Sequence, residues 1–308
     1  MPRLGVVGAT GAVGRVVVDL LGERGFEDVR LFASSRSAGT EIDGRVVEEA
    51  TPEALSAGDL DVCFFSVGSK ASRELVPHAV RAGALCVDKS EAFRLQDGIP
   101  LVVPEVNGAR ALEHDGIVAN PNCCSIPLSL VLKPLHDEVG LRAVRVATYQ
   151  SASGKGARRL QQLLDEPQAE HDLSSDWDFD GEEFDEETKI REETRKILEL
   201  PELPVSATCV RVPVPIGHAE SVWVETEEPL DAARAREVLA AAPSVQVEDF
   251  PTPRAAAGGD EVLVGRIRPD RAGDGLSLHL ACDNLRKGAA LNGIQIAELV
   301  LSQRRIAA

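Results

Sequence analysis

Short apolar segments alternate with helix-like segments over the first 120 residues, and this alternation restricts the fold more than any other feature of the chain. Strands with two apolar faces are typical of a parallel sheet that helices cover on both sides. The expected helices are 13–24 and 73–82. We therefore expect a doubly wound, Rossmann-type nucleotide-binding sheet. Its expected strands are 4–9, 29–33, 62–67, 85–88, 101–103 and 117–120.

The pattern changes after residue 122. A helix is expected over 122–138, in which Pro127 fits the first turn and Pro134 should produce a kink. The strands that follow alternate in polarity, so the second domain is expected to be α+β with a largely antiparallel sheet. They are 143–150, 206–214, 221–226, 262–268 and 276–282. A last helix, 286–303, should return to the first domain, which gives an α/β fold with domains 1–122 plus 285–308 and 123–284.

The net charge of −17 disfavours binding to nucleic acid or to an anionic membrane. No apolar run reaches the roughly 18–20 residues that span a bilayer. The chain opens on a strand-like run rather than a signal peptide, so a cytoplasmic location is expected. The acidic stretch 166–193 is interpreted as a solvated surface. The six cysteines form no CxxC pair, which argues against a disulfide framework and against a zinc site.

A glycine motif with the spacing GxxGxxG occupies residues 8–14, between the first expected strand and the first expected helix. Glycines allow a diphosphate to approach the backbone, and the helix N-terminus offers N–H groups and a positive partial charge. The alternative is a tight turn that binds nothing. The residues expected to contact the nucleotide are Gly8, Thr10, Gly11, Ala12 and Val13.

The second expected strand is followed by Arg36 and Ser37, where an NAD enzyme usually carries an acidic residue. An arginine beside hydroxyl groups suits a 2′-phosphate, so NADP is the expected cofactor. The alternative is an ordinary surface arginine.

Cys123 follows an expected strand and directly precedes an expected helix. A helix N-terminus lowers the pKa of a thiol and so favours the reactive thiolate. Asn122 and the backbone N–H of residue 123 could stabilise an oxyanion. On these features alone, a buried and inert cysteine remains the default interpretation.

The motif Pro121-Asn122-Cys123 resembles the active-site turn of aspartate-semialdehyde dehydrogenases, and other family motifs occur in the family's order between residues 5 and 300. These are the 8–14 glycine run, Leu31-Phe32-Ala33-Ser34, Arg36-Ser37-Ala38-Gly39, Ala92-Phe93-Arg94, Val102-Val103-Pro104-Glu105-Val106-Asn107, Thr148-Tyr149-Gln150, Ser153-Gly154, Glu193-Thr194-Arg195-Lys196, Cys209-Val210-Arg211-Val212-Pro213-Val214, Gly217-His218 and Asp283-Asn284-Leu285-Arg286-Lys287-Gly288-Ala289-Ala290.

The resemblance implies a reversible reaction in which L-aspartate 4-semialdehyde, phosphate and NADP give 4-aspartyl phosphate and NADPH. It places the enzyme in the biosynthesis of lysine, threonine, methionine and diaminopimelate. It also implies that residues 123–284 form a catalytic and dimerisation domain, and that the enzyme is a homodimer or a dimer of dimers. No metal is expected, because the thiolate, the oxyanion donors and the hydride acceptor complete the chemistry.

The same resemblance assigns roles to single residues. Cys123 would be the nucleophile, His218 the general acid–base, and Gln150 the residue that orients the substrate or the cysteine, with Asn122 at the same turn. Arg211 would bind the substrate carboxylate, and we expect it to alternate away from Val210, Val212 and Val214, which would face the core. The remaining assignments are Arg94 and Lys189 for phosphate, Glu186 for the substrate amino group, and Ser153, Gly154 and Asn284 for the cofactor.

Two departures from the family pattern matter. Cys124 stands where the family usually has serine, and we hypothesise that it traps an oxidised Cys123 in an intramolecular linkage. Residues 157–185 are shorter and more acidic than the family's region. Two other functions stay open: an N-acetyl-glutamyl-phosphate reductase of the same architecture, disfavoured by the Arg211–His218 motif, and a non-catalytic nucleotide-binding paralogue, which should lack Cys123 or His218.

Overall fold

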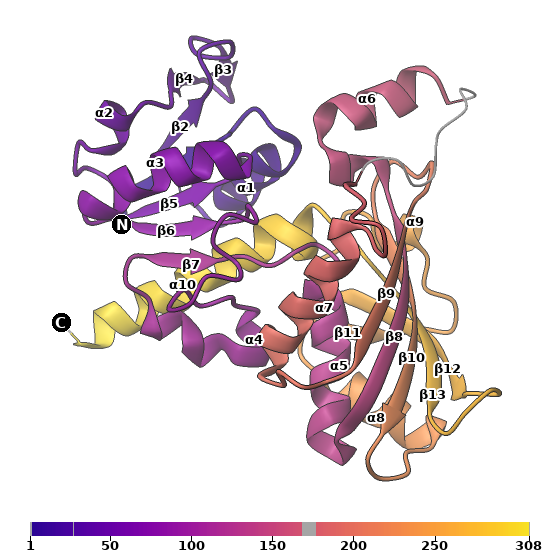
Figure 1. Ribbon diagram of the computed structural model, residues 1–308. Coiled ribbons are helices and arrows are strands. Elements are labelled where there is room, and N and C mark those ends of the chain that lie inside the picture. Colours follow the sequence, from indigo (N-terminus) through magenta and orange to yellow (C-terminus); the bar gives the residue numbers. More distant parts are fainter. Residues whose placement is uncertain (1, 27, 168–176, 308) are drawn as a thin grey trace. The chain divides into compact units, whose positions relative to one another are not determined.

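The computed structural model describes residues 2–26, 28–167 and 177–307, which pack as two compact units (Figure 1). Unit 1 consists of residues 1–121 and 289–308, and unit 2 of residues 122–288. Among the described residues, no helix has both the length and the apolar composition that crossing a membrane would need.

Unit 1 contains a seven-stranded sheet in the order β3-β4-β2-β1-β5-β6-β7. All its strand pairs are parallel except β3–β4, as the continuous apolar runs predict. The strands are β1 (Leu4–Val7), β2 (Val29–Ala33), β3 (Glu41–Ile42), β4 (Arg45–Glu49), β5 (Val62–Phe65), β6 (Leu85–Asp88) and β7 (Ile117–Ala119).

The helices of unit 1 are α1 (Ala12–Glu23), α2 (Pro52–Leu55), α3 (Ser69–Arg81), α4 (Pro104–Asn107) and α10 (Leu291–Ala307), with a 3₁₀ turn at Gly108–Glu113. Helix α10 follows a π-helical turn, Arg286–Ala290, and lies beside β6 (Figure 1). Its Ile294 and Ile296 join the same apolar core as Val6 and Val18. The C-terminal helix therefore does return to the first unit, as its amphipathic pattern predicts.

One expected strand of unit 1 is absent. Residues 101–103 make only an isolated bridge, between Leu101 and Ala119, instead of a strand. Pro104 begins helix α4 immediately afterwards, and proline suits the first position of a helix. The hairpin β3–β4 was not expected, because each of its strands is short and partly exposed.

Unit 2 is built on a six-stranded sheet in the order β11-β12-β13-β10-β8-β9. The pairs β12–β13, β13–β10 and β10–β8 are antiparallel, whereas β8–β9 and β11–β12 are parallel. The sheet is therefore largely antiparallel, as expected. The strands are β8 (Leu141–Gln150), β9 (Val205–Arg211), β10 (His218–Thr226), β11 (Val245–Val247), β12 (Val262–Pro269) and β13 (Leu276–Cys282).

Three helices of unit 2 pack on the sheet: α5 (Ser125–Val139), α7 (Asp185–Leu198) and α8 (Ala232–Ala240) (Figure 1). Helix α5 begins three residues after the expected start and runs through Pro134 as one helix. The remaining helices are α6 (Ala157–Asp165), α9 (Pro253–Ala256) and a 3₁₀ turn at Ala152–Lys155.

The interpretation of 166–193 as a solvated surface is wrong for its last part, 185–193, whereas 178–182 are exposed. Helix α7 buries Glu186, Glu187 and Glu193. Each carboxylate accepts hydrogen bonds from unit 2, which offsets the cost of removing it from water. Residues 168–176 of the stretch lie outside the described residues.

Two glycines of α1 form a matched pair for a stability test. A Cβ at Gly14 would lie 2.1 Å from the carbonyl oxygen of Gly8, whereas a Cβ at Gly22 would meet nothing within 4 Å. Gly14→Ala should lower the free energy of unfolding by about 1–3 kcal/mol through overpacking. Gly22→Ala should raise it by up to about 1 kcal/mol, because alanine favours helix. Urea unfolding of both variants checks this, and equal shifts would contradict the predicted close approach at Gly14.

Glu220, on β10, should make the stability of unit 2 depend on pH. It is fully buried, and among the described residues no N–H or O–H group donates to either carboxyl oxygen; the thiol of Cys124, a weak donor, is the one group that partly offsets the burial. Burial, followed by the charge of Cys123, raises the pKa of Glu220 well above its usual range.

The folded protein therefore keeps a proton that the unfolded chain releases, so this contribution to stability is complete at low pH and declines as pH rises. Glu220→Gln carries no such proton. The variant should gain stability relative to the parent between pH 5 and pH 8 in urea unfolding, and a difference that does not change with pH would sink the idea.

Candidate active site

Three hydrogen bonds fix the turn that carries Cys123. The backbone N–H of Asn122 donates to Glu193 at 2.6 Å, the Asn122 side-chain amide donates to Glu186 at 2.9 Å, and the Asn122 Oδ1 accepts from the backbone N–H of Cys124 at 2.8 Å. Cys124 is the N-cap of α5, so Cys123 immediately precedes the cap. The expected position of Cys123 near a helix N-terminus is confirmed.

Cys123 is also the only partly exposed cysteine of the six, all of which lie in the described part of the chain. Burial raises the pKa of the other five thiols, to about 12 for Cys63 and well above the ordinary value for Cys86, Cys124, Cys209 and Cys282. Those five are therefore poor nucleophiles, and Cys123 is the candidate reactive thiol.

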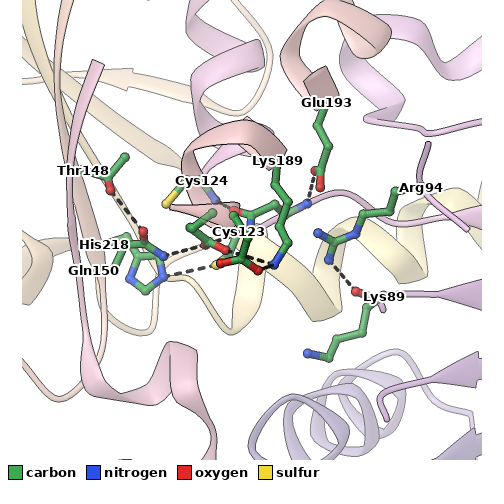
Figure 2. Close-up of polar contacts among 12 residues, drawn as sticks. Lys89, Arg94, Cys123, Cys124, Thr148, Gln150, Lys189, Glu193 and His218 are labelled. Atoms are coloured by element: carbon green, nitrogen blue, oxygen red, sulfur yellow. Dashed lines mark hydrogen bonds and ion pairs between the residues drawn. The ribbon is translucent and has the colours of Figure 1, made fainter. Parts of the chain in front are cut away.

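His218 is the first residue of β10, and its Nε2 lies 3.2 Å from the Sγ of Cys123 (Figure 2). The backbone N–H of Ser151 donates to Nδ1 at 3.0 Å. A ring nitrogen that accepts a hydrogen bond carries no proton, so this contact assigns the proton of the neutral imidazole to Nε2. His218 therefore presents an N–H donor to the sulfur.

A buried network holds this histidine. The Oδ1 of Asn284 accepts hydrogen bonds from the Oγ of Ser151 at 3.0 Å, from the Oγ of Ser153 at 3.2 Å and from the N–H of Gly217 at 2.8 Å. Asn284 therefore ties the turn before His218 to the segment that follows β8. Ser151 was missed from the sequence, because a lone serine after a strand carries no distinctive signal.

Gln150 and Glu186 meet beside the cysteine turn. The Gln150 Nε2 donates to the Oε1 of Glu186 at 3.0 Å, and the Gln150 Oε1 accepts from the hydroxyl of Thr148 at 3.1 Å (Figure 2). One oxygen of Glu186 thus binds both Gln150 and Asn122. Lys189, one turn further along α7, pairs with Asp185 at 2.6 Å and lies 3.8 Å from Glu186.

Arg211 ends β9 and is 4% exposed. Its Nη1 donates to the carbonyl of Ser151 at 3.0 Å, and its guanidinium lies over the ring of Trp177, with 4.6 Å from Cζ to the ring centroid. The expectation that Val210, Val212 and Val214 face the core is wrong, because all three are only partly buried. The buried residues of β9 are instead Val205, Cys209 and Arg211. Helix α7 is a neighbour of this strand, and its Glu187 accepts a hydrogen bond from the backbone N–H of Cys209.

Gly154 lies against two of these side chains. A Cβ at this position would come within 2.9 Å of Arg211 Nη1 and 3.0 Å of His218 Cε1. Unit 2 thus brings together the following expected site residues: Asn122, Cys123, Gln150, Ser153, Gly154, Glu186, Lys189, Arg211, His218 and Asn284. Trp177, Glu193 and Ser151 were not assigned a role from the sequence, although Glu193 lies in a family motif and Trp177 is an aromatic residue in an acidic stretch.

The other expected site residues belong to unit 1. Arg94 is buried, and its guanidinium donates to the backbone carbonyls of Asn120 at 3.1 Å and Lys89 at 2.5 Å (Figure 2). These bonds hold it beside the ends of β6 and β7.

The glycine motif turns sharply from β1 into α1. Gly8 has φ +88°, and a Cβ there would lie 2.4 Å from the carbonyl oxygen of Ser66. Gly11 is the N-cap of α1, so no side chain at this position caps the N–H groups of the first helical turn. Thr10 is exposed, and Ala12 and Val13 begin the helix. Arg36, which is exposed, and Ser37 follow the neighbouring parallel strand, so they lie at the same edge of the sheet as this loop.

Comparisons with known proteins place both units in one family. Residues 3–114 match the family model described as "Semialdehyde dehydrogenase, NAD binding domain", and residues 132–287 match "Semialdehyde dehydrogenase, dimerisation domain". The aspartate-semialdehyde dehydrogenase of Streptomyces akiyoshiensis is 44% identical, over 98% of this chain and 99% of the relative. That of Bacillus subtilis is 39% identical, over 96% of each.

Solved structures agree. Aspartate semialdehyde dehydrogenase II of Vibrio cholerae, complexed with ASA, superposes with a TM-score of 0.92 at 37% identity, over 98% of each chain. The Candida albicans enzyme with NADP gives a TM-score of 0.81 at 27% identity, over 99% of each chain. These matches extend over nearly the whole chain, which therefore belongs to the aspartate-semialdehyde dehydrogenase family.

Proposed function

We propose that this chain interconverts L-aspartate 4-semialdehyde and 4-aspartyl phosphate, in a reversible reaction that depends on NADP and phosphate and proceeds through a thioester on Cys123. The observation that carries the proposal is the 3.2 Å contact between the Cys123 Sγ and the His218 Nε2, with the Ser151 N–H on the other ring nitrogen. The biosynthesis of lysine, threonine, methionine and diaminopimelate is the corresponding pathway.

In the oxidative direction, Cys123 Sγ adds to the aldehyde carbon and the carbonyl electron pair moves to oxygen. The proton on Nε2 of His218 can stabilise the thiolate first and the developing oxyanion next. Asn122 and the backbone N–H of residue 123 are further oxyanion donors. Bound NADP supplies the hydride acceptor. A phosphate oxygen then attacks the thioester carbon, the C–S bond breaks, and the thiolate of Cys123 is restored.

Substrate binding follows from the charges around the cysteine. The Arg211 guanidinium suits the substrate carboxylate, and Glu186 suits the substrate ammonium group. Gln150 shares one oxygen of Glu186 with Asn122 and so couples substrate orientation to the cysteine turn. Lys189 and Arg94 are the proposed phosphate-binding cations.

The residues of unit 1 fit a dinucleotide. The loop with Gly8, Thr10, Gly11, Ala12 and Val13 would hold the diphosphate at the N-terminus of α1. Arg36 and Ser37, at the same sheet edge, would hold the 2′-phosphate of NADP. Ser153, Gly154 and Asn284 of unit 2 would contact the nicotinamide end.

We also propose a homodimer or a dimer of dimers, formed through residues 123–284, and a cytoplasmic location. The match of residues 132–287 to the family's dimerisation domain supports the assembly. Partly exposed aromatic side chains on β8, β10 and β13 (Tyr149, Trp223 and His279) offer a surface for such a contact.

Activity tests the proposal directly. The parent should reduce NADP with aspartate semialdehyde only when phosphate is present. Cys123→Ala should lose at least about four orders of magnitude in kcat, because no other group can form the thioester. Cys124→Ser should stay within a few-fold of the parent. N-acetyl-glutamate semialdehyde serves as the comparison substrate, and preference for it would refute the substrate assignment.

The Cys124 hypothesis stays a prediction. The two sulfurs and one ring nitrogen of His218 all lie within 4.8 Å of one another. Hydrogen peroxide should convert the Cys123 thiolate to a sulfenic acid, and the Cys124 thiol should then displace its hydroxyl as water to form an S–S bond. Mass spectrometry should detect a linked 123–124 peptide that a reductant cleaves. If only over-oxidised Cys123 is found, the trap does not operate.

A further inference from the structure

We propose that Trp177 is a positioning residue that fixes the Arg211 guanidinium for the substrate carboxylate and so sets the affinity for the amino-acid end of the substrate. The identity of the substrate rests on the proposed function, whereas the contact itself does not. Cζ of Arg211 lies 4.6 Å from the centroid of the Trp177 ring. This distance is within the range of a cation–π interaction, and tryptophan is the strongest partner for one.

Arg211 is restrained on several sides. Its Nη1 donates to the Ser151 carbonyl, and Gly154 packs so closely that a Cβ there would lie 2.9 Å from Nη1. Ser151 also donates its N–H to His218, so the same residue positions the carboxylate-binding cation and the imidazole. A long arginine side chain has many rotamers, and the contact with the indole restrains it further.

The indole and a carboxylate use different properties of the guanidinium. The ring face attracts the positive charge and accepts no particular N–H, whereas a carboxylate accepts hydrogen bonds from the N–H groups. Trp177 can therefore hold the cation through an interaction other than the one that binds the substrate.

Trp177 is itself anchored to the helix that carries the other substrate-binding groups. Its ring lies 6.1 Å from that of Phe184, the N-cap of α7, and the Phe184 N–H donates to Glu187 at 2.8 Å. The next residues of α7 include Glu186. The Trp177–Phe184 contact therefore links the groups proposed for the carboxylate and the ammonium of the substrate.

Steady-state kinetics separates positioning from a merely structural role. Trp177→Ala should raise KM for aspartate semialdehyde roughly 2- to 30-fold with kcat within about twofold of the parent. Trp177→Phe should recover most of the affinity, because a phenyl ring also binds a cation. Phe179→Ala is the matched control, because Phe179 is 60% exposed and its ring makes a tilted contact with the same Phe184 ring. Unchanged KM in Trp177→Ala, or the same rise in Phe179→Ala, would overturn the proposal.

Fluorescence tests the same contact without turnover. The chain has two tryptophans, so Trp223→Phe leaves Trp177 as the sole indole reporter. L-2-Aminobutyrate, which has the ammonium and carboxylate but no aldehyde, should change its emission saturably, and Arg211→Lys in that background should shift the midpoint. No change at high probe concentration would contradict the assignment. Saturable binding in a protein without dehydrogenase activity would instead refute only the proposed function.

Discussion

Buried carboxylates on one helix hold the reactive turn in place. Glu193 accepts the backbone N–H of Asn122, and Glu186 accepts the side chains of Asn122 and Gln150. Burying a carboxylate costs free energy unless hydrogen-bond donors surround it. The two glutamates therefore hold Asn122 and Gln150 in place, and these donors in turn stabilise the buried glutamates. A shift of the turn at 122–124 would break these hydrogen bonds, and they thereby hold the Sγ of Cys123 in position relative to β8 and β10. Helix α7 thus acts as part of the site rather than as a solvated covering.

The second constraint fixes which ring nitrogen of His218 carries the proton. Because the Ser151 N–H points at Nδ1, His218 can be neutral only with its proton on Nε2, facing the cysteine. The imidazole then presents an N–H donor to the sulfur of Cys123 in the protein without substrate. Asn284 makes this arrangement stiff, since it binds both the segment that follows β8 and the turn that precedes β10.

Much of this could be foreseen from the sequence. Continuous apolar runs gave the parallel sheet of unit 1, and alternating runs gave the strands of unit 2, because strand periodicity reports burial directly. Cys123 and His218 needed the family resemblance, since a lone cysteine and a lone histidine carry no signal of proximity. The burial of glutamates on α7 could not be predicted from the sequence. A run of acidic residues indicates a solvated surface unless the hydrogen-bond donors that other segments bring to it are known. The buried face of β9 was also predicted wrongly. The valines at alternate positions indicated the core-facing side, but the side that carries Cys209 and Arg211 is the buried one.

The register of the central strands limits where the chain can gain or lose residues without disrupting the site. Gln150 pairs with Arg211 across β8 and β9, and His218 pairs with Cys282 across β10 and β13. Moving β9 by one residue would send Arg211 to the opposite side of the sheet and bring a valine in its place. Insertions and deletions within these strands would therefore dismantle the site. Only connections that contribute none of its residues can change in length while the chemistry stays tied to an unbroken hydrogen-bond ladder.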